Sequence, residues 1–201
     1  MAAAGAWVLV SAAASIAYVA LLRGINVGGK NIVAMKSLKA SFEQLGFDDV
    51  STYINSGNVL FRSSEKDPRK LEDRIDKMLA RDYDLKPATV VRSYAEMRRL
   101  QKSIAKHWKT PDPDWRYNVI FLRHAIDSKD VLNDLGVKPD IEAVVYCPGT
   151  LLWRARVRDL TRTAMIKIAG KPIYKQMTIR NLNTTNKLVE LLEQMQRSVR
   201  A

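Results

Sequence analysis

The stretch that most directly predicts the fold is Val50-Ser-Thr-Tyr-Ile-Asn-Ser-Gly-Asn-Val-Leu-Phe61. Its two ends are rich in β-branched and aromatic residues, which favour strands. Between them lie Asn55 to Asn58, whose side chains and glycine are typical of tight turns. Two strand-like runs separated by such a turn predict a β-hairpin.

Helical and extended patterns flank this hairpin on both sides. Apolar residues recur every three or four positions in the segments before and after it, which predicts two amphipathic helices. Asp67 and Pro68 are typical of the N-cap and first position of the second helix. The elements expected in the first half are a strand at 16–22, a helix at 35–45, the hairpin at 50–61, a helix from 68 and a strand at 88–92. This order is that of the ferredoxin-like fold.

The second half repeats the order and adds a helix. We expect a strand at 117–122, a helix capped by Ser128, a hairpin at 144–153, a helix starting at Thr161 or Thr163, an extended piece at 176–179 and a final helix capped by Asn183 or Thr184. A capping box, Ser93 to Glu96, starts one more helix at the end of the first half. The predicted fold class is α+β, with two tandem ferredoxin-like (βαββαβ) units plus a C-terminal helix.

The pattern also predicts the domain boundaries. Pro111 and Pro113 interrupt the helical pattern and indicate a linker. We expect an N-terminal extension, a first unit with a trailing helix, the linker, and a second unit with the C-terminal helix, at residues 1–15, 16–108, 109–116 and 117–201. The extension, in which Ala dominates, is expected to be disordered.

The composition favours anionic partners. Lys and Arg number 33 against 21 acidic residues, a net charge of +12. Nucleotides, RNA or an acidic protein surface are therefore expected partners, although many basic proteins bind none of these. Cys147 is the single cysteine and there are two histidines, which excludes an intrachain disulfide and a Cys/His zinc framework. No metal or cofactor is predicted.

The first 22 residues carry no charged side chain. Such a run could mark a membrane span, or a signal if residues 1–14 act as one, in which case the protein is exported. No basic residue precedes the apolar part, and Ala, Gly and Ser keep it weakly hydrophobic. A cytoplasmic protein with no membrane association is therefore the expectation.

Three polar segments lie beside predicted strands and are the candidate ligand-binding site. They offer cations, amides, hydroxyls and glycine backbone, groups that bind phosphate or carboxylate. The alternative is that these residues only cap helices and shape turns. The candidate residues are Arg23, Gly24, Asn26, Gly28, Gly29, Lys30, Asn31, Tyr53, Ser56, Asn58, Arg180, Asn181 and Asn183.

These segments also carry a resemblance. The runs Leu22–Gly29, Thr52–Phe61 and Met177–Thr185, in this order, resemble the mostly bacterial family catalogued as domain of unknown function 1697. The resemblance extends from Tyr18 to Met195 and implies an α+β fold of two ferredoxin-like units in a cytoplasmic protein. It implies no activity, because the family has no established function.

A second basic feature follows the second hairpin. Arg154, Arg156 and Arg158 alternate and would share one face of a strand, with Arg162 and Lys167 beyond them. This face is a candidate track for a nucleic-acid backbone. A solvated face, or an edge strand protected by charge, is the equal alternative.

Catalytic patterns are weak. His107 and His124 are isolated and predicted to be surface or structural, and Cys147 has no partner base. The function predicted best is a binding protein for a phosphate-bearing ligand, either a nucleotide or RNA, in a basic, Asn-rich cleft between the units. The alternatives are an enzyme that stabilises an anionic intermediate in the same cleft, or a module that docks an acidic protein.

Overall fold

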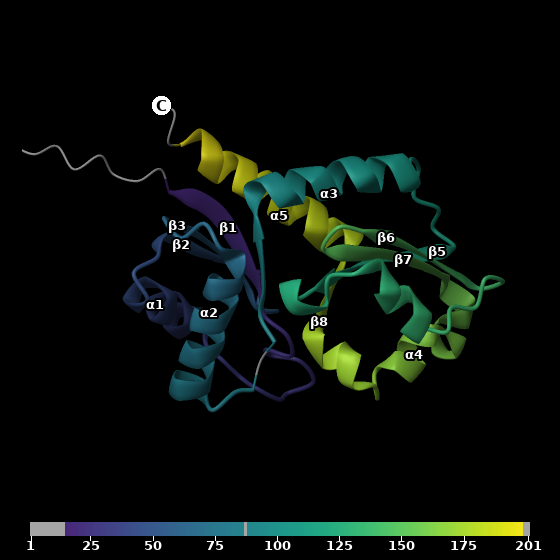
Figure 1. Cartoon of the computed structure of the whole chain (residues 1–201), viewed down its shortest axis with the longest axis horizontal. Coiled ribbons are helices and arrows are strands. Elements are labelled where there is room, and N and C mark those ends of the chain that lie inside the picture. Colours follow the sequence, from purple (N-terminus) through teal and green to yellow (C-terminus); the bar gives the residue numbers. More distant parts are fainter. Residues whose placement is uncertain (1–14, 87, 199–201) are drawn as a thin grey trace, which may run out of the picture.

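A computed structural model describes residues 15–86 and 88–198 and has an α+β architecture with two four-stranded antiparallel sheets (Figure 1). The first sheet has the order β2-β3-β1-β4, and its strands are β1 (Ile16–Leu21), β2 (Asp48–Tyr53), β3 (Asn58–Ser63) and β4 (Val90–Ser93). The second has the order β6-β7-β5-β8, with β5 (Trp115–Leu122), β6 (Glu142–Cys147), β7 (Thr150–Arg156) and β8 (Met177–Asn181).

The two sheets repeat each other in register as well as in order. Val19 of β1 pairs with Arg92 of β4, and Val119 of β5 pairs with Arg180 of β8. The ends of β1 and β5 likewise meet the starts of β3 and β7 in the same register. Each half therefore places an arginine at the equivalent position of its last strand.

Each sheet carries its own helices on its outer face. In the first half these are α1 (Met35–Gln44) and α2 (Pro68–Tyr83), which pack on the sheet through Phe42, Ile75 and Phe61 of β3. In the second half the corresponding elements are shorter, namely η1 (His124–Ile126), η2 (Lys129–Asp134), η3 (Val157–Arg162), α4 (Ala164–Ile168) and η4 (Pro172–Gln176).

The inner faces of the two sheets share a core with two long helices. Val19 and Leu60 from the first sheet and Val119 and Leu152 from the second belong to one buried cluster. Helices α3 (Tyr94–His107) and α5 (Leu182–Arg197) complete it and run side by side above both sheets (Figure 1). Both faces of each sheet are thus covered, which explains why β1 and the last four residues of β5 are continuous apolar runs.

The structure confirms the predicted start signals of the first half. Asp67 accepts a hydrogen bond from the backbone of Arg69, and Ser93 with Glu96 forms the capping box of α3. Gly46, with φ of +77°, ends α1 as expected.

The helix expected from Thr161 or Thr163 to Gly170 is present as α4, with Thr163 as its N-cap and Ala169 as its C-cap. Three other predictions for the second half are wrong in detail. The segment after Ser128 is a six-residue 3-10 helix, too short to sustain an α-helix. Asn181, not Asn183 or Thr184, caps α5, because β8 runs directly into that helix. Strand β7 ends at Arg156 because the chain turns into η3 at Val157, so Arg158 does not lie on the strand.

No helix in residues 15–86 and 88–198 is long and apolar enough to cross a bilayer. The expectations of a disordered extension and of a signal at residues 1–14 fall outside the described residues.

Candidate functional site

Arg180 is the point at which the three polar segments meet. It is 8% exposed, and its Nε donates to Asn58 Oδ1 at 2.5 Å. Its Nη2 donates to the carbonyl oxygens of Leu22, Ser56 and Gly57 at 2.9, 3.0 and 3.2 Å. The guanidinium of the second half therefore joins the start of the loop at 23–31 to the β2–β3 hairpin of the first half.

The hairpin can approach this closely because of Gly57. Its φ is +70°, and a Cβ at this position would lie 2.9 Å from Leu22 Cβ. Both the backbone conformation and the space require glycine. The Gly in the predicted turn thus serves the contact between the halves as well as the turn itself.

Arg180 has no carboxylate partner among the described residues. Its remaining donor, Nη1, bonds to Thr178 Oγ1 and to the carbonyl oxygen of Ile179. Every acceptor is neutral, and burial lowers the pKa of Arg180 to about 10. The guanidinium remains charged at neutral pH, so the interface contains a buried positive charge that neutral dipoles alone stabilise.

The loop at 23–31 is held by its own asparagines. Asn26 Oδ1 accepts from the backbone of Val33 at 2.8 Å, and its Nδ2 donates to the carbonyl oxygen of Asn55 at 2.9 Å. Asn31 Nδ2 donates to the carbonyl oxygen of Gly24 at 2.9 Å. These amides shape the loop, whereas the backbone at Gly28 and Gly29 and the Lys30 side chain are exposed.

Arg23 lies beside two hollows. The first has a volume of about 280 Å³ and is lined by Arg23, Gly24, Val27, Tyr174, Thr178 and Arg180, among others. The Arg23 guanidinium stacks over the Tyr174 ring at 4.7 Å, so both halves contribute to this wall. The second, of about 260 Å³, lies between Arg23, Asn31 and Lys86.

The other candidate residues lie elsewhere. Asn58 is fully buried beneath Arg180, and Tyr53 packs against the shared core. The side-chain oxygen of Asn181 accepts the hydrogen bond that caps α5. Asn181 and Asn183 also line a separate hollow of about 400 Å³ beside Trp115. The structure therefore brings Arg23, Gly24, Asn31 and Arg180 to the two hollows and leaves Tyr53, Asn58, Asn181 and Asn183 away from them.

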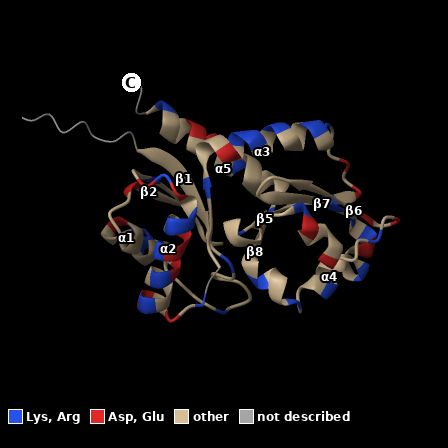
Figure 2. Cartoon of the chain, in the orientation of Figure 1, with Lys and Arg blue, Asp and Glu red and all other residues tan. Residues whose placement is uncertain are grey.

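The predicted basic face is only partly formed. Arg154 and Arg156 both stack on Trp115, with 4.7 and 5.3 Å from guanidinium carbon to ring centre. Arg158 lies in η3, off the strand, and pairs with Asp159, as does Arg162. Lys167 is exposed on α4. Figure 2 shows Lys and Arg on the helices of both halves, with Asp and Glu interspersed along α2, rather than a single basic track.

A second arginine, Arg92, makes the equivalent contact elsewhere in the interface between the two halves. Arg92, 2% exposed, donates through Nη2 to the carbonyl oxygens of Leu122 and Gly149. These positions correspond to Leu22 and Gly57, because Leu22 and Leu122 also donate their backbone N–H groups to Gly57 and Gly149. Each half thus sends one buried arginine into the hairpin of the other.

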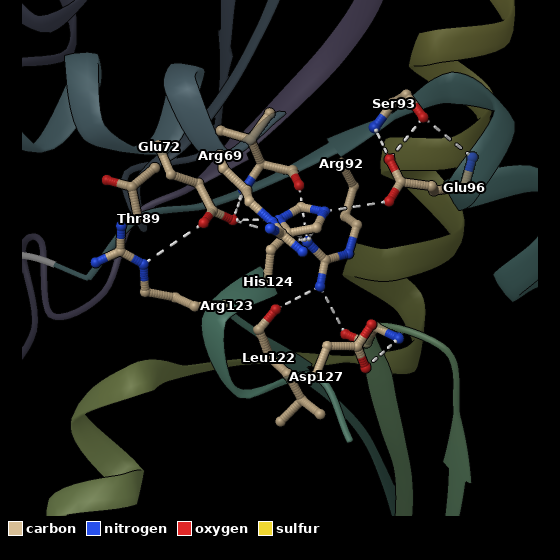
Figure 3. A network of polar contacts seen from close by, with 12 residues as sticks. Arg69, Glu72, Thr89, Arg92, Ser93, Glu96, Leu122, Arg123, His124 and Asp127 are labelled. Atoms are coloured by element: carbon tan, nitrogen blue, oxygen red, sulfur yellow. Dashed lines mark hydrogen bonds and ion pairs between the residues drawn. The ribbon is translucent and has the colours of Figure 1, made fainter. Parts of the chain in front are cut away.

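The two arginines differ in their counter-charges. Arg92 lies 3.8 Å from Glu72, which is itself 2% exposed and accepts from His124 Nδ1 at 2.8 Å (Figure 3). Glu96, on the other side of His124, is 3.4 Å from its Nε2. Arg123 pairs with Glu72 at 3.6 Å and with two further acids of α2. The Arg92 end is neutralised by protein carboxylates, and the Arg180 end is not.

Comparison with known proteins gives the family. The model of a family described as protein of unknown function, DUF1697, matches residues 16–153. The chain belongs to this family. A solved structure of a conserved bacterial protein, SP0830 from Streptococcus pneumoniae, is similar with a TM-score of 0.78 and 28% identity, over 90% of this chain and 99% of that one. No curated protein matches at a significant level.

Sequence reasoning on this DUF1697 protein missed the Arg92 and His124 network. His124 is not isolated, because α2, α3 and β4 surround it with Glu72, Glu96 and Arg92. One signal was available: Val91-Arg92 and Ile179-Arg180 occupy the same place in the two repeated halves. Among the described residues no group of three or more His, Cys, Asp or Glu side chains could hold a metal ion.

His124 gives a prediction for stability against pH. Burial alone would lower the pKa of His124, but hydrogen bonds to Glu72 and Glu96 outweigh it and raise the pKa to about 8. Because the pKa is higher in the folded than in the unfolded state, protonated His124 stabilises the fold. This stabilisation is fully present below the unfolded pKa near 6.5 and is lost as the pH rises through 8. Urea denaturation should show a loss of about 2 kcal/mol between pH 6 and 9.

The control is His124→Gln, which cannot be protonated. The difference in unfolding free energy between wild type and this variant should shrink over the same pH range, because other titrating groups cancel in the subtraction. A difference that is constant from pH 6 to 9 contradicts the prediction.

Proposed function

We propose that this protein binds a small phosphate-bearing ligand, a nucleotide in the first place, at the hollow between the loop at 23–31 and β8. One observation carries the proposal: Arg180 lines that hollow as a buried cation whose partners are all neutral. An anion there would supply the counter-charge that Glu72 supplies to the equivalent Arg92. Arg23, at the mouth, adds a second guanidinium suited to phosphate.

Two further features support a small ligand. The hollow of about 280 Å³ is near the lower end of small-molecule sites. It suits a phosphate group with the part of a molecule next to it, and Tyr174 and the exposed Val27 line it together with Arg23.

The choice of a nucleotide over RNA follows from the sheets. We infer that each sheet and its helices form a ferredoxin-like unit, because the order β2-β3-β1-β4 is the one a βαββαβ chain gives and β6-β7-β5-β8 repeats it. RNA-binding units of this kind stack bases on an open sheet face. Here the inner faces meet in the shared core and the outer faces carry helices, which favours a ligand at the loops.

The test is isothermal titration with ADP and with adenosine at two salt concentrations. We expect ADP to bind, adenosine to bind far more weakly, and ADP affinity to fall as salt rises. Arg23→Ala should weaken ADP binding roughly 10- to 100-fold, the loss of one charge-assisted contact.

Lys102→Ala is the matched control, because Lys102 is exposed on α3 and lines none of the hollows at Arg23. Its ADP affinity should equal that of wild type. If ADP and adenosine bind alike, or if Arg23→Ala and Lys102→Ala have the same effect, the proposed function is wrong.

A further inference from the structure

Another hollow lies at the Arg92 end of the interface between the two halves. It has a volume of about 640 Å³ and is bordered by the first residues of α2 and α3 and by His124 of η1. Lys66, Arg69 and Arg99 line it, and Arg69 and Arg99 are exposed at its rim. Four groups that are cationic or can be protonated therefore surround one space.

The three Lys and Arg side chains lack ion-pair partners. Among the described residues no carboxylate lies within 4.0 Å of the charged nitrogens of Lys66, Arg69 or Arg99. In contrast, Arg123 nearby is paired with three acids of α2. These three side chains are therefore free to form ion pairs with an anionic ligand.

The two acids on the wall are committed to other contacts. Asp67 Oδ1 accepts from the backbone of Arg69 at 2.9 Å, as the N-cap of α2. Glu96 Oε2 accepts from the backbone of Ser93 at 2.8 Å, and its other oxygen faces His124. Both carboxylates are held at a helix start, where a negative charge is favourable, and neither forms an ion pair with Lys66, Arg69 or Arg99.

A second hollow extends this space toward the β6–β7 hairpin. It has a volume of about 380 Å³ and shares Glu96 and Arg99 with the first. Gly149 forms part of its wall, and a Cβ at Gly149 would lie 2.9 Å from Arg92 Nε. That buried Nε has no hydrogen-bond acceptor among the described residues. Figure 3 shows Arg92 between Glu96 and Asp127, the two acids that border this second hollow.

We propose that these joined hollows form a second anion-binding site, for a small molecule that carries two or more phosphate groups. Lys66 precedes the N-cap of α2, Arg69 lies in the first turn of α2, and Arg99 lies in α3. Cations on separate elements can each contact a different phosphate, which favours a diphosphate over a monophosphate. The site lies at the opposite end of the interface from the Arg180 hollow and does not depend on the function proposed there.

Titration with inorganic pyrophosphate and with inorganic phosphate tests this site. Pyrophosphate should bind more tightly than phosphate. Arg69→Ala and Arg99→Ala should each weaken pyrophosphate binding roughly tenfold or more. Lys102 lies on the same helix as Arg99 but does not line the hollows, so Lys102→Ala should leave the pyrophosphate affinity unchanged. Circular dichroism should show that all three variants are folded.

The Arg23→Ala variant separates this proposal from the function proposed above. Arg23→Ala should leave pyrophosphate binding at the joined hollows unchanged, whereas it should weaken ADP binding at the Arg180 hollow. Pyrophosphate binding that is lost in Arg23→Ala but kept in Arg69→Ala and Arg99→Ala assigns the anion to the Arg180 hollow and overturns the second site. A wild-type protein with no binding at about 1 mM pyrophosphate in low salt also overturns it.

Discussion

Replacing Arg180 with alanine is expected to lower the free energy of unfolding by roughly 3–5 kcal/mol. The guanidinium satisfies Asn58 and the carbonyl oxygens of Leu22, Ser56 and Gly57, all from the other half of the chain. Alanine would leave these acceptors buried and unpaired, at about 1–3 kcal/mol for each that water fails to reach. Loss of the desolvated charge offsets part of this cost.

Urea denaturation of three variants measures the effect. Arg180→Lys keeps the charge but loses the planar fork of donors, so its stability should fall between wild type and Arg180→Ala. Arg158→Ala is the control, because the Arg158 side chain is 77% exposed and its loss should cost no more than about 0.5 kcal/mol. If Arg180→Ala costs as little as Arg158→Ala, the carbonyl contacts do not hold the halves together.

Local patterns account for the part of the fold that was predicted. The hairpin at 50–61, the Asp67–Pro68 start of α2 and the capping box at Ser93 each depend on a few neighbouring residues. The second half was predicted less well because its elements are short. Helix α4 has five residues and η2 has six, and in such segments packing outweighs propensity.

The candidate site could be predicted only in part, because its geometry depends on distant residues. Arg180 and Leu22 are 158 residues apart, and no local pattern indicates that they touch. From the sequence alone, a polar residue next to a strand could either bind a ligand or form hydrogen bonds within the protein. The structure decides between these: Asn26 and Asn58 make internal contacts, and Arg23 faces a hollow.

The two buried arginines, Arg92 and Arg180, differ in the groups that compensate their charge. One repeated arrangement, a buried arginine against the facing hairpin, occurs twice, with acids at Arg92 and with neutral partners at Arg180. The buried charge is compensated differently in the two places, by carboxylates at Arg92 and by neutral acceptors at Arg180. The difference in charge is therefore what supports a ligand at the Arg180 end.

Replacing Glu72 with glutamine should lower the free energy of unfolding by roughly 2–4 kcal/mol at pH 7, although it removes little volume. The carboxylate accepts from His124 Nδ1 at 2.8 Å and from the backbone of Val91 at 3.1 Å, and it lies 3.8 Å from Arg92. Burial already lowers the pKa of Arg92. Without the negative charge, this buried guanidinium loses its nearest acid and His124 loses its stronger partner.

Asp73→Asn makes the same chemical change at the next residue of α2 and is the matched control. Asp73 is 70% exposed and, within residues 15–86 and 88–198, pairs with the Arg123 guanidinium alone, at 3.4 Å, so this variant should cost less than about 1 kcal/mol. In Glu72→Gln the loss of stability from pH 6 to 9 should also become smaller, because Glu72 helps to raise the pKa of His124. Equal effects of the two variants, or an unchanged pH dependence in Glu72→Gln, would show that Glu72 is not the counter-charge of the Arg92 end. The asymmetry between the two arginines would then no longer support a ligand at Arg180.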